Sequence, residues 1–509
     1  MRAMEAAQDG LSPLSQRIAR TLRAGGARPA VEFEETWSSW ADLHGLAVAL
    51  VERLDERAPA AGRIGLIARN RPTVLAAMLG LIAAGRTIVM LNAAQTPERL
   101  AAELSALRLA AVVAERDYWT APAIEAARAA GTLQVTLPGA FGEPVLAAAR
   151  PRVAPDLDRD PQVALELLSS GTTGPPKRIP IRWRTLEAAL GSAHGTPLFD
   201  GGADALAGAD LPPAISGLSL GNIGGVYMIL PSALIGQRIV LLEKFAVAPW
   251  ARAVRLYRPE MLSVQPVGLR MILEAQVPPE DLASLKWIVS GASHLDPDLQ
   301  DVFEQRYGMR VFGAYGATET CGSIVMWTDA LYDEFRHEKR GSVGRPATGV
   351  AIRIMDPESG EPSPTGEVGR LEAKVDRVGP DWISTTDLAY LDDDGFVFIT
   401  GRSDNAINRG GYKVAPEEVV EALRRHPAVR DASVVGLADE RLGEVPVAAV
   451  ELMPGHAPPS EAELRDFARR HLLAYQVPAR IVITEALPRN ASLKVMAPAV
   501  RDLFGPDPA

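Results

Sequence analysis

Residues 63–91 read RIGLIARNRPTVLAAMLGLIAAGRTIVML, and this stretch decides the fold class. The apolar run 63–68 predicts a strand, residues 74–84 follow a helical apolar pattern, and 87–91 predict a second strand. Short apolar segments farther along, several separated by helix-length stretches, continue the pattern. They are AAVVAE (110–115), RIVLLEKF (238–245), MLSVQP (261–266) and WIVSGA (287–292). This alternation predicts α/β layers with largely parallel sheets.

The length of 509 residues exceeds one ordinary core, so two or more domains are expected. LAYLDDDGFVFITGR (388–402) predicts a hairpin around an Asp-Gly turn, with its three aspartates at a solvated tip. Beyond it we expect an α+β unit with a helix from Pro416, strands near 432–437 and 445–452, and a capping box at 460–463. The predicted domains are 1–400 and 405–509, joined at 401–404.

Charge and composition exclude several classes of protein. A net charge of −10 without a basic stretch argues against a general nucleic-acid binder. The single cysteine, Cys321, excludes an internal disulfide and a multi-cysteine metal site. The N-terminus has no apolar core typical of a signal peptide, and the longest smooth apolar run, 74–85, has 12 residues, too few to span a bilayer. We therefore expect a cytoplasmic protein without a membrane span.

SSGTTGPPK (169–177) follows the apolar segment VALELL (163–168) and has the composition of a phosphate-binding loop. Glycines allow backbone N–H groups to converge on an anion, hydroxyls add donors, and the final lysine adds charge. The pattern lacks the spacing of a Walker loop. Taken alone, it is also compatible with a flexible surface loop.

Further motifs follow in order: YGATET (315–320), STTDLAYLDDDGFVFITGR (384–402), NRGGYKVAPEEVVEAL (408–423) and LPRNASLK (487–494). With the loop at 169–177, this series resembles the adenylate-forming superfamily, which includes acyl-CoA synthetases, adenylation domains of peptide synthetases and firefly-type luciferases. The resemblance covers about residues 40–509. It implies a large N-terminal multi-layer α/β domain and a small mobile α+β C-terminal domain.

The resemblance implies a reaction in two steps. A carboxylate attacks the α-phosphate of ATP to give acyl-AMP and pyrophosphate, and a thiol such as that of CoA then displaces AMP. ATP, Mg²⁺ and CoA are the implied cofactor and co-substrates, and a small carboxylic acid is the implied partner. The oligomeric state stays open, with a homodimer as one alternative.

The resemblance also assigns roles to individual residues. Lys177, Thr318, Glu319 and Lys494 would be catalytic, with Glu319 also holding Mg²⁺ and Lys494 meeting the forming acyl-phosphate bond. The implied ATP- and AMP-binding residues are Ser169, Ser170, Gly171, Thr172, Thr173, Gly174, Gly291, Ala292, Ser293, Gly313, Ala314, Tyr315, Gly316, Asp387 and Arg402, of which Asp387 would bind the ribose hydroxyls. Asp404 would be the hinge, and Gly410 and Gly411 would line the pantetheine tunnel. The implied acid pocket consists of Ala214, Ile215, Ser216, Gly217, Ala317 and Gly322.

Three positions depart from the family pattern. Leu493 precedes Lys494 where glycine is usual, and Thr386 stands where glycine is common. The stretch LPPAISGLSLGN (211–222) offers small apolar residues where relatives commonly place a histidine or an aromatic residue. Together with Gly322, this stretch favours an aromatic or a medium-to-long aliphatic acid over acetate or an amino acid.

The main expectation is a free-standing acid–CoA ligase. Three alternatives stay open: a stand-alone enzyme that loads a carrier protein, an ATPase or kinase-like protein that releases ADP, and a non-catalytic protein that binds an acyl-adenylate. The first alternative differs from the ligase in CoA dependence, and the second would have no need of Lys494.

Overall fold

The computed structural model describes residues 10–58, 62–146, 160–168, 177–194, 204–357, 359–403, 406–409, 412–439, 442–490 and 493–505. The chain divides into two compact units. The first contains 1–169, 176–328 and Asp376–Gly379, and the second contains Asp329–Val375 and Pro380–Ala509 as its long segments. The domain boundary predicted at 401–404 falls inside the second unit and stays a prediction.

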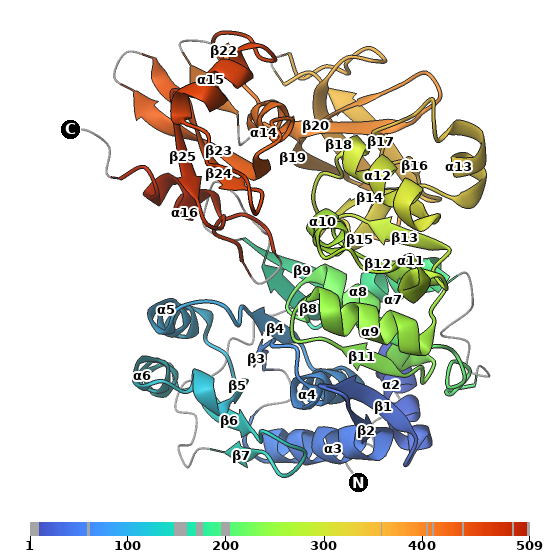
Figure 1. Cartoon of the computed structure of the whole chain (residues 1–509). Helices are drawn as coiled ribbons and strands as arrows, with labels where there is room; N and C mark the ends of the chain where they lie inside the picture. Colours follow the sequence, from blue (N-terminus) through green and yellow to red (C-terminus); the bar gives the residue numbers. More distant parts are fainter. Residues whose placement is uncertain are drawn as a thin grey trace. The chain divides into compact units, whose positions relative to one another are not determined.

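The first unit contains three sheets (Figure 1). The largest runs in the order β7 (Val145–Leu146), β6 (Leu133–Leu137), β5 (Ala111–Glu115), β3 (Ile64–Ile67), β4 (Ile88–Leu91), β8 (Val163–Leu168) and β9 (Arg178–Arg182). A second runs β10 (Ala214–Ser216), β11 (Ile239–Leu241), β1 (Pro29–Phe33) and β2 (Thr36–Ser39). The third contains β12 (Met261–Ser263), β13 (Trp287–Ser290), β14 (Arg310–Ala317) and β15 (Gly322–Met326), in that order.

Helices connect and cover these sheets. In chain order they are α2 (Pro13–Gly25), α3 (Trp40–Arg57), α4 (Pro72–Ala83), α5 (Pro97–Leu107), the short 3-10 helix η1 (Arg116–Tyr118), α6 (Ala121–Ala129), α7 (Trp183–His194), α8 (Ile223–Leu234), α9 (Val247–Tyr257), α10 (Pro266–Glu274), α11 (Pro279–Leu282) and α12 (Pro297–Tyr307).

The stretch 63–91 forms the predicted strand, helix and strand, and β3 pairs with β4 in parallel. Side chains alternate across β4: Ile88 and Met90 pack on the same core as α4, whereas Val89 and Leu91 pack on the opposite face with α5. Both faces are therefore buried, which explains the unbroken apolar run. The edge pairs β6–β7 and β8–β9 are antiparallel, so the sheet is parallel mainly at its centre.

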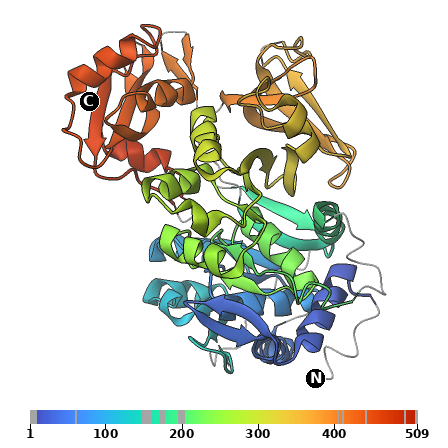
Figure 2. The ribbon, with the colours of Figure 1, turned by 45° about the vertical axis from the view of Figure 1, so that its right-hand side comes forward.

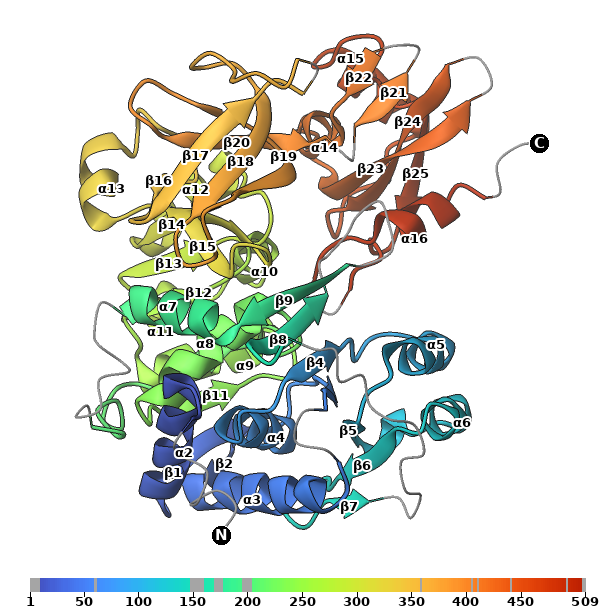
Figure 3. The ribbon, with the colours of Figure 1, turned by 180° about the vertical axis from the view of Figure 1, so that it is seen from behind.

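The second unit holds two further sheets (Figure 3). One consists of β17 (Val350–Met355), β18 (Gly369–Val375), β19 (Trp382–Leu391) and β20 (Val397–Arg402), all antiparallel. The predicted Asp-Gly hairpin is confirmed as β19–β20. The unit also contains α13 (Asp329–Phe335) and β16 (Arg345–Pro346).

The C-terminal part of this unit is confirmed as α+β. The strand β24 (Gly443–Leu452) is at the centre of its sheet. Its other elements are β21 (Ile407–Arg409), β22 (Tyr412–Val414), α14 (Pro416–Arg424), β23 (Val429–Asp439), α15 (Glu461–Arg469), β25 (Arg480–Thr484) and α16 (Ala497–Asp502). Alternate residues of β23 and β24 pack on α14 and α15 on one face and on α16 on the other. Figure 2 shows this sheet and its helices in orange to red. The predicted capping box at Ser460 and Glu463 opens α15.

Among the described residues, no helix combines the length and apolar character that crossing a bilayer requires. The apolar run around residues 74–85 instead forms α4, which is buried in the core of the first unit.

Two helical glycines on neighbouring helices differ in their surroundings. A Cβ added at Gly80 of α4 would lie 2.8 Å from the Cβ of Ala47 on α3, whereas a Cβ at Gly45 of α3 would meet nothing within 4 Å. We expect Gly80→Ala to lower the free energy of unfolding by about 1–3 kcal/mol through overpacking. Gly45→Ala should raise it by up to about 1 kcal/mol, because alanine loses less backbone entropy in a helix. Chemical denaturation measures both, and shifts of equal sign would contradict the packing account.

Candidate active site

The YGATET motif forms the end of β14 and a tight turn into β15. The N–H of Cys321 donates to the carbonyl of Thr318 at 3.1 Å, and Cys321 has a φ of 53°. The hydroxyl of Thr320 accepts from Ala317 N–H at 2.9 Å and lies 2.8 Å from the carbonyl oxygen of Gly322. Thr320 is 1% exposed, so its hydroxyl closes the turn from within. Thr318 and Glu319 lie in this turn and are only partly buried.

A second support of the turn comes from Arg377, which the sequence analysis did not single out. One of its terminal nitrogens donates to the carbonyl oxygens of Thr320 at 3.1 Å and of Ser323 at 3.0 Å. The turn is thus held by a buried hydroxyl and by a guanidinium from a distant part of the chain. No local sequence signal marks Arg377, because its two acceptors are backbone carbonyls far from it in sequence.

Small residues are required where β13 and β14 end side by side. Ser290 pairs with Gly313, and a Cβ at Gly291 would lie 2.8 Å from the carbonyl oxygen of Ala314. A Cβ at Gly316 would lie 2.3 Å from the carbonyl oxygen of Gly322. Ala292 and Ser293 are exposed just beyond β13, and Ala314, Tyr315 and Ala317 are half-buried along β14. The structure therefore brings the two predicted ATP- and AMP-binding segments, 291–293 and 313–316, together at one end of one sheet.

The predicted acid-pocket stretch 214–217 lies in and just after β10. Ile215 is 2% exposed and packs in the core of the first unit with Trp250. Ser216 is also buried, and its hydroxyl accepts from the N–H of Leu218 at 3.3 Å. A Cβ at Gly217 would lie 2.8 Å from the backbone nitrogen of Phe245. Ala214 is half-buried. The pocket role of these residues stays a prediction.

Tyr227 of α8 faces Gly322, and the sequence analysis missed it. A Cβ at Gly322 would lie 2.8 Å from the Tyr227 ring, and burial raises the pKa of this phenol to about 12, so it is neutral near pH 7. Its hydroxyl donates to the carbonyl oxygen of Ala189 on α7. The only sequence signal was a single phenol within a helix that is apolar apart from Ser232.

The glycine- and hydroxyl-rich loop connects the paired ends of β8 and β9. Ser169 to Gly174 lie outside the described residues, as do Asp404, Gly410 and Gly411. Leu168 and Arg178 are cross-strand partners, and Lys177 is exposed. Arg178 pairs with Glu103 of α5 and donates to the carbonyl oxygen of Met90 at 3.2 Å. Arg178 thus anchors the far end of the loop to β4 and α5.

Asp387 and Arg402 are brought together by the β19–β20 hairpin. They are cross-strand partners, and a terminal nitrogen of Arg402 lies 3.8 Å from a carboxylate oxygen of Asp387. Arg402 also donates to the hydroxyl of Thr386, the residue that replaces the usual glycine. The side chain of Asp387 is 17% exposed, so part of its carboxylate is available to a ligand.

Lys494 is near this pair. Burial lowers the pKa of its ammonium, the positive charge of Arg402 lowers it further, and Asp387 partly opposes both effects. The structure of the second unit therefore places the predicted catalytic lysine within electrostatic range of the predicted ribose-binding pair, although 92 residues of sequence separate it from Arg402.

A magnesium site fits the donor set around Glu319. Within the described part of the chain, no three His, Cys, Asp or Glu side chains gather into a ready-made metal site. Mg²⁺ does not need one, because it is commonly held by one or two carboxylates together with substrate phosphates and water. Glu319, on a rigid turn, supplies the kind of oxygen ligand that this ion prefers.

Comparison with known proteins shows the family. Residues 18–378 match the model of the AMP-binding enzyme, and residues 418–494 match that of the AMP-binding enzyme C-terminal domain. The chain belongs to the family of AMP-binding enzymes.

Individual relatives cover nearly the full chain. A 2-succinylbenzoate–CoA ligase from Bacillus pumilus is 30% identical over 92% of this chain and 93% of its own. 4-coumarate–CoA ligase 3 from Oryza sativa subsp. japonica is 29% identical over 94% and 89%. The structure of o-succinylbenzoate CoA synthetase from Bacillus subtilis in complex with its acyl-adenylate intermediate has a TM-score of 0.74 and 25% identity, covering 96% of this chain and 98% of that one.

The Thr320 hydroxyl provides a test of the turn. We expect Thr320→Val to lower the free energy of unfolding by about 1–3 kcal/mol, because the partly buried Ala317 N–H and Gly322 carbonyl lose their bonds to a buried hydroxyl. The Mg²⁺ concentration for half-maximal activity should rise several-fold, since Glu319 is on the same turn. Thr484→Val is the matched control, because that hydroxyl bonds to the Ala486 carbonyl near the surface. An unchanged Mg²⁺ response would show that the turn does not position the metal ligand.

Proposed function

We propose that this chain, an AMP-forming acid–CoA ligase that uses ATP and Mg²⁺, activates an aromatic carboxylic acid. The observation that carries the substrate class is the contact between Tyr227 and Gly322. A neutral, largely buried phenol ring beside a glycine offers a flat apolar wall, which suits an aromatic ring, while its hydroxyl is held by the Ala189 carbonyl. The named relatives are ligases of 2-succinylbenzoate and 4-coumarate, both aromatic acids.

The chemistry proceeds by two displacements. A carboxylate oxygen of the acid forms a bond to the α-phosphorus of ATP, the bond to the β-phosphate oxygen breaks, and pyrophosphate leaves. The sulfur of CoA then forms a bond to the acyl carbon, and AMP leaves with the electron pair of the broken bond. The protein contributes positioning and charge stabilisation.

We assign the residue roles as follows. Lys177 and the hydroxyls of 169–173 bind the β- and γ-phosphates, Thr318 contacts the α-phosphate, and Glu319 ligates Mg²⁺. Asp387 accepts from the ribose hydroxyls with Arg402 beside it. Lys494 stabilises charge on the forming acyl-phosphate bond. Its proximity to Asp387 and Arg402 supports this assignment, because the lysine is then close to the nucleotide that they bind.

The carrier-protein alternative is not favoured, because the aligned relatives are CoA ligases across nearly the whole chain. The domains at 1–400 and 405–509, the hinge at Asp404 and the tunnel at Gly410 and Gly411 are also part of the proposal. The two family models leave 379–417 between them, which is compatible with a boundary at 401–404. A cytoplasmic location and a homodimer stay predictions.

The substrate class is tested by acid-dependent exchange between ATP and pyrophosphate over matched aromatic, branched and fatty acids, followed by addition of CoA. We expect exchange with aromatic acids and release of AMP that depends on CoA. Exchange with fatty acids alone would overturn the aromatic assignment. Exchange without a response to CoA would indicate a carrier protein as acceptor.

Lys494→Ala should cut acyl-adenylate formation by about 10²–10³-fold, because a unit charge about 4 Å from the developing charge contributes about 4 kcal/mol at an effective dielectric near 20. Thioester formation from supplied acyl-adenylate should be largely spared. Single-turnover measurement of each half-reaction checks this. Equal loss in both steps would contradict the role.

The expected pH dependence of adenylation follows from the lowered pKa of Lys494. The pKa of Lys494 lies below the ordinary 10.5, so the ammonium loses its proton as pH rises through that lower value. The exchange rate at subsaturating ATP, which reports the enzyme without bound nucleotide, should therefore fall at a lower alkaline pH than an ordinary lysine would give. In Lys494→Arg the residual rate should not show this fall, since a guanidinium keeps its charge. An identical alkaline limb in both proteins would assign the titration to another group.

A further inference from the structure

Leu493, directly before Lys494, has a backbone conformation that leucine rarely adopts. Its φ is 59°, in the left-handed region that side chains with a Cβ disfavour. The N–H of Leu493 donates to the carbonyl of Asn490 at 2.9 Å, and Asn490 in turn donates to the carbonyl of Lys494 at 2.8 Å. The Asn490 side chain also accepts from Lys494 N–H at 3.0 Å. Both the N–H and the carbonyl of Lys494 are thus bonded to Asn490, and the residue directly before the lysine has a strained backbone.

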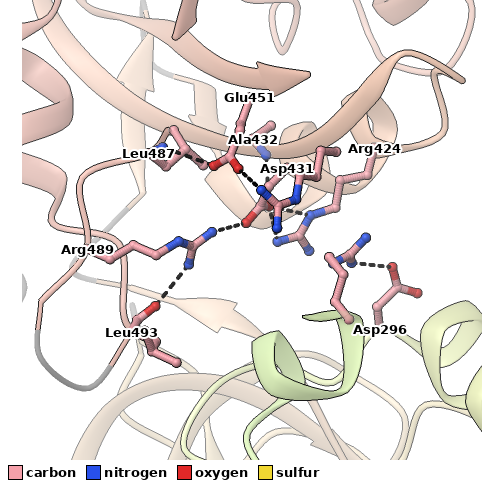
Figure 4. A network of polar contacts seen from close by, with 10 residues as sticks. Asp296, Arg424, Asp431, Ala432, Glu451, Leu487, Arg489 and Leu493 are labelled. Carbon is pink, nitrogen blue, oxygen red and sulfur yellow. Dashed lines mark hydrogen bonds and ion pairs between the residues drawn. The ribbon is translucent and has the colours of Figure 1, made fainter. Parts of the chain in front are cut away.

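Arg489 holds the carbonyl of the strained residue. One terminal nitrogen of its guanidinium donates to the carbonyl oxygen of Leu493 at 2.9 Å, and the other donates to Asp431 of β23 (Figure 4). Figure 4 shows the Arg489 fork extending between these two acceptors. A guanidinium presents its donors in a fixed plane, so fixing one nitrogen also fixes the direction of the other.

Asp431 is a rigid support for this fork. Its side chain is 7% exposed, and its other oxygen accepts from Arg424 at 2.9 and 2.6 Å and from the N–H of Ala432 at 2.8 Å. Burial would raise the pKa of this carboxyl, but the charges of Arg424 and Arg489 outweigh it and hold the pKa below its usual range. The carboxylate therefore stays charged near neutral pH and keeps its place in the sheet.

We propose that Arg489, supported by Asp431, is a positioning residue that holds Leu493 in its left-handed conformation and thereby directs Lys494 for acyl-adenylate formation. The inference rests on the proposed role of Lys494. The role of Arg489 also explains why leucine is tolerated at a position whose conformation favours glycine. The charged hydrogen bond from Arg489 to the Leu493 carbonyl offsets the strain at that residue.

The test measures both half-reactions in the full-length protein carrying Arg489→Met. We expect adenylation to fall about tenfold and thioester formation from supplied acyl-adenylate to change less than about twofold. The variant should fold, because Asp431 keeps Arg424 and the Ala432 N–H as partners. Equal losses in both half-reactions would overturn the proposal in favour of general destabilisation.

Two control variants test whether the effect needs the planar pair of donors and whether it is specific to Arg489. Arg489→Lys keeps a cation for Asp431 but lacks the planar pair of donors, so it should recover stability and only part of the adenylation rate. Arg353→Met removes a matched pair elsewhere in the second unit, where Arg353 bonds to buried Glu372 at 2.9 and 2.7 Å. We expect it to leave the ratio of the half-reactions unchanged. A change in that ratio as large as that of Arg489→Met would overturn the proposal.

Two double variants test whether Arg489 acts through its neighbours. Arg489→Met combined with Lys494→Ala should be no slower in adenylation than Lys494→Ala alone, because the lysine to be positioned is gone. Leu493→Gly should restore adenylation about threefold or more in the Arg489→Met background, since glycine adopts the left-handed conformation without help. Additive losses, or no recovery with glycine, would overturn the positioning role.

The panel also distinguishes failure of the inference from failure of its premise. If Lys494→Ala affects both half-reactions equally, the proposed role of the lysine fails, and the positioning inference fails with it. If Lys494→Ala is selective and Arg489→Met is not, the lysine role stands and only the positioning inference is overturned.

Discussion

A buried carboxylate must be fully partnered, and Asp431 meets this requirement by connecting three segments of the second unit. Arg424 brings in α14, the Ala432 N–H belongs to β23 itself, and Arg489 brings in the segment that leads to Lys494. Removing this carboxylate would take away the anionic partner of two guanidinium groups, those of Arg424 and Arg489. The position of the C-terminal lysine segment therefore depends on the same interaction that joins the helix to its sheet.

The electrostatics around Lys494 are suited to an anionic ligand. Burial and the neighbouring Arg402 both disfavour its ammonium form, and Asp387 compensates only in part. A nucleotide phosphate near this group would supply the missing negative charge and raise the pKa of the lysine. The nucleotide would then keep Lys494 protonated, which is the form that its proposed role in adenylation requires.

Backbone strain recurs in the motif segments. Positive φ values at non-glycine residues occur at Ala292 beside Gly291, at Cys321 in the turn that carries Glu319, and at Leu493 beside Lys494. Such conformations persist only where surrounding contacts enforce them. The contacts that enforce two of these conformations are clear. Thr320 and Arg377 hold the turn that contains Cys321, and Arg489 holds Leu493.

The sequence by itself determined the α/β order, the β19–β20 hairpin, the capping box at Ser460 and the motif residues, because each depends on periodicity, turn chemistry or spacing within a short segment. It also indicated that Leu493 was unusual, but not how the chain accommodates it. Only the tertiary structure showed Arg377 at the turn after β14, Tyr227 against Gly322, and Arg489 bridging Asp431 and Leu493. Apart from the bond between Arg489 and Leu493, these contacts join residues far apart in sequence. Several of them end on backbone carbonyls, which every residue possesses, so no local pattern of side chains could reveal them.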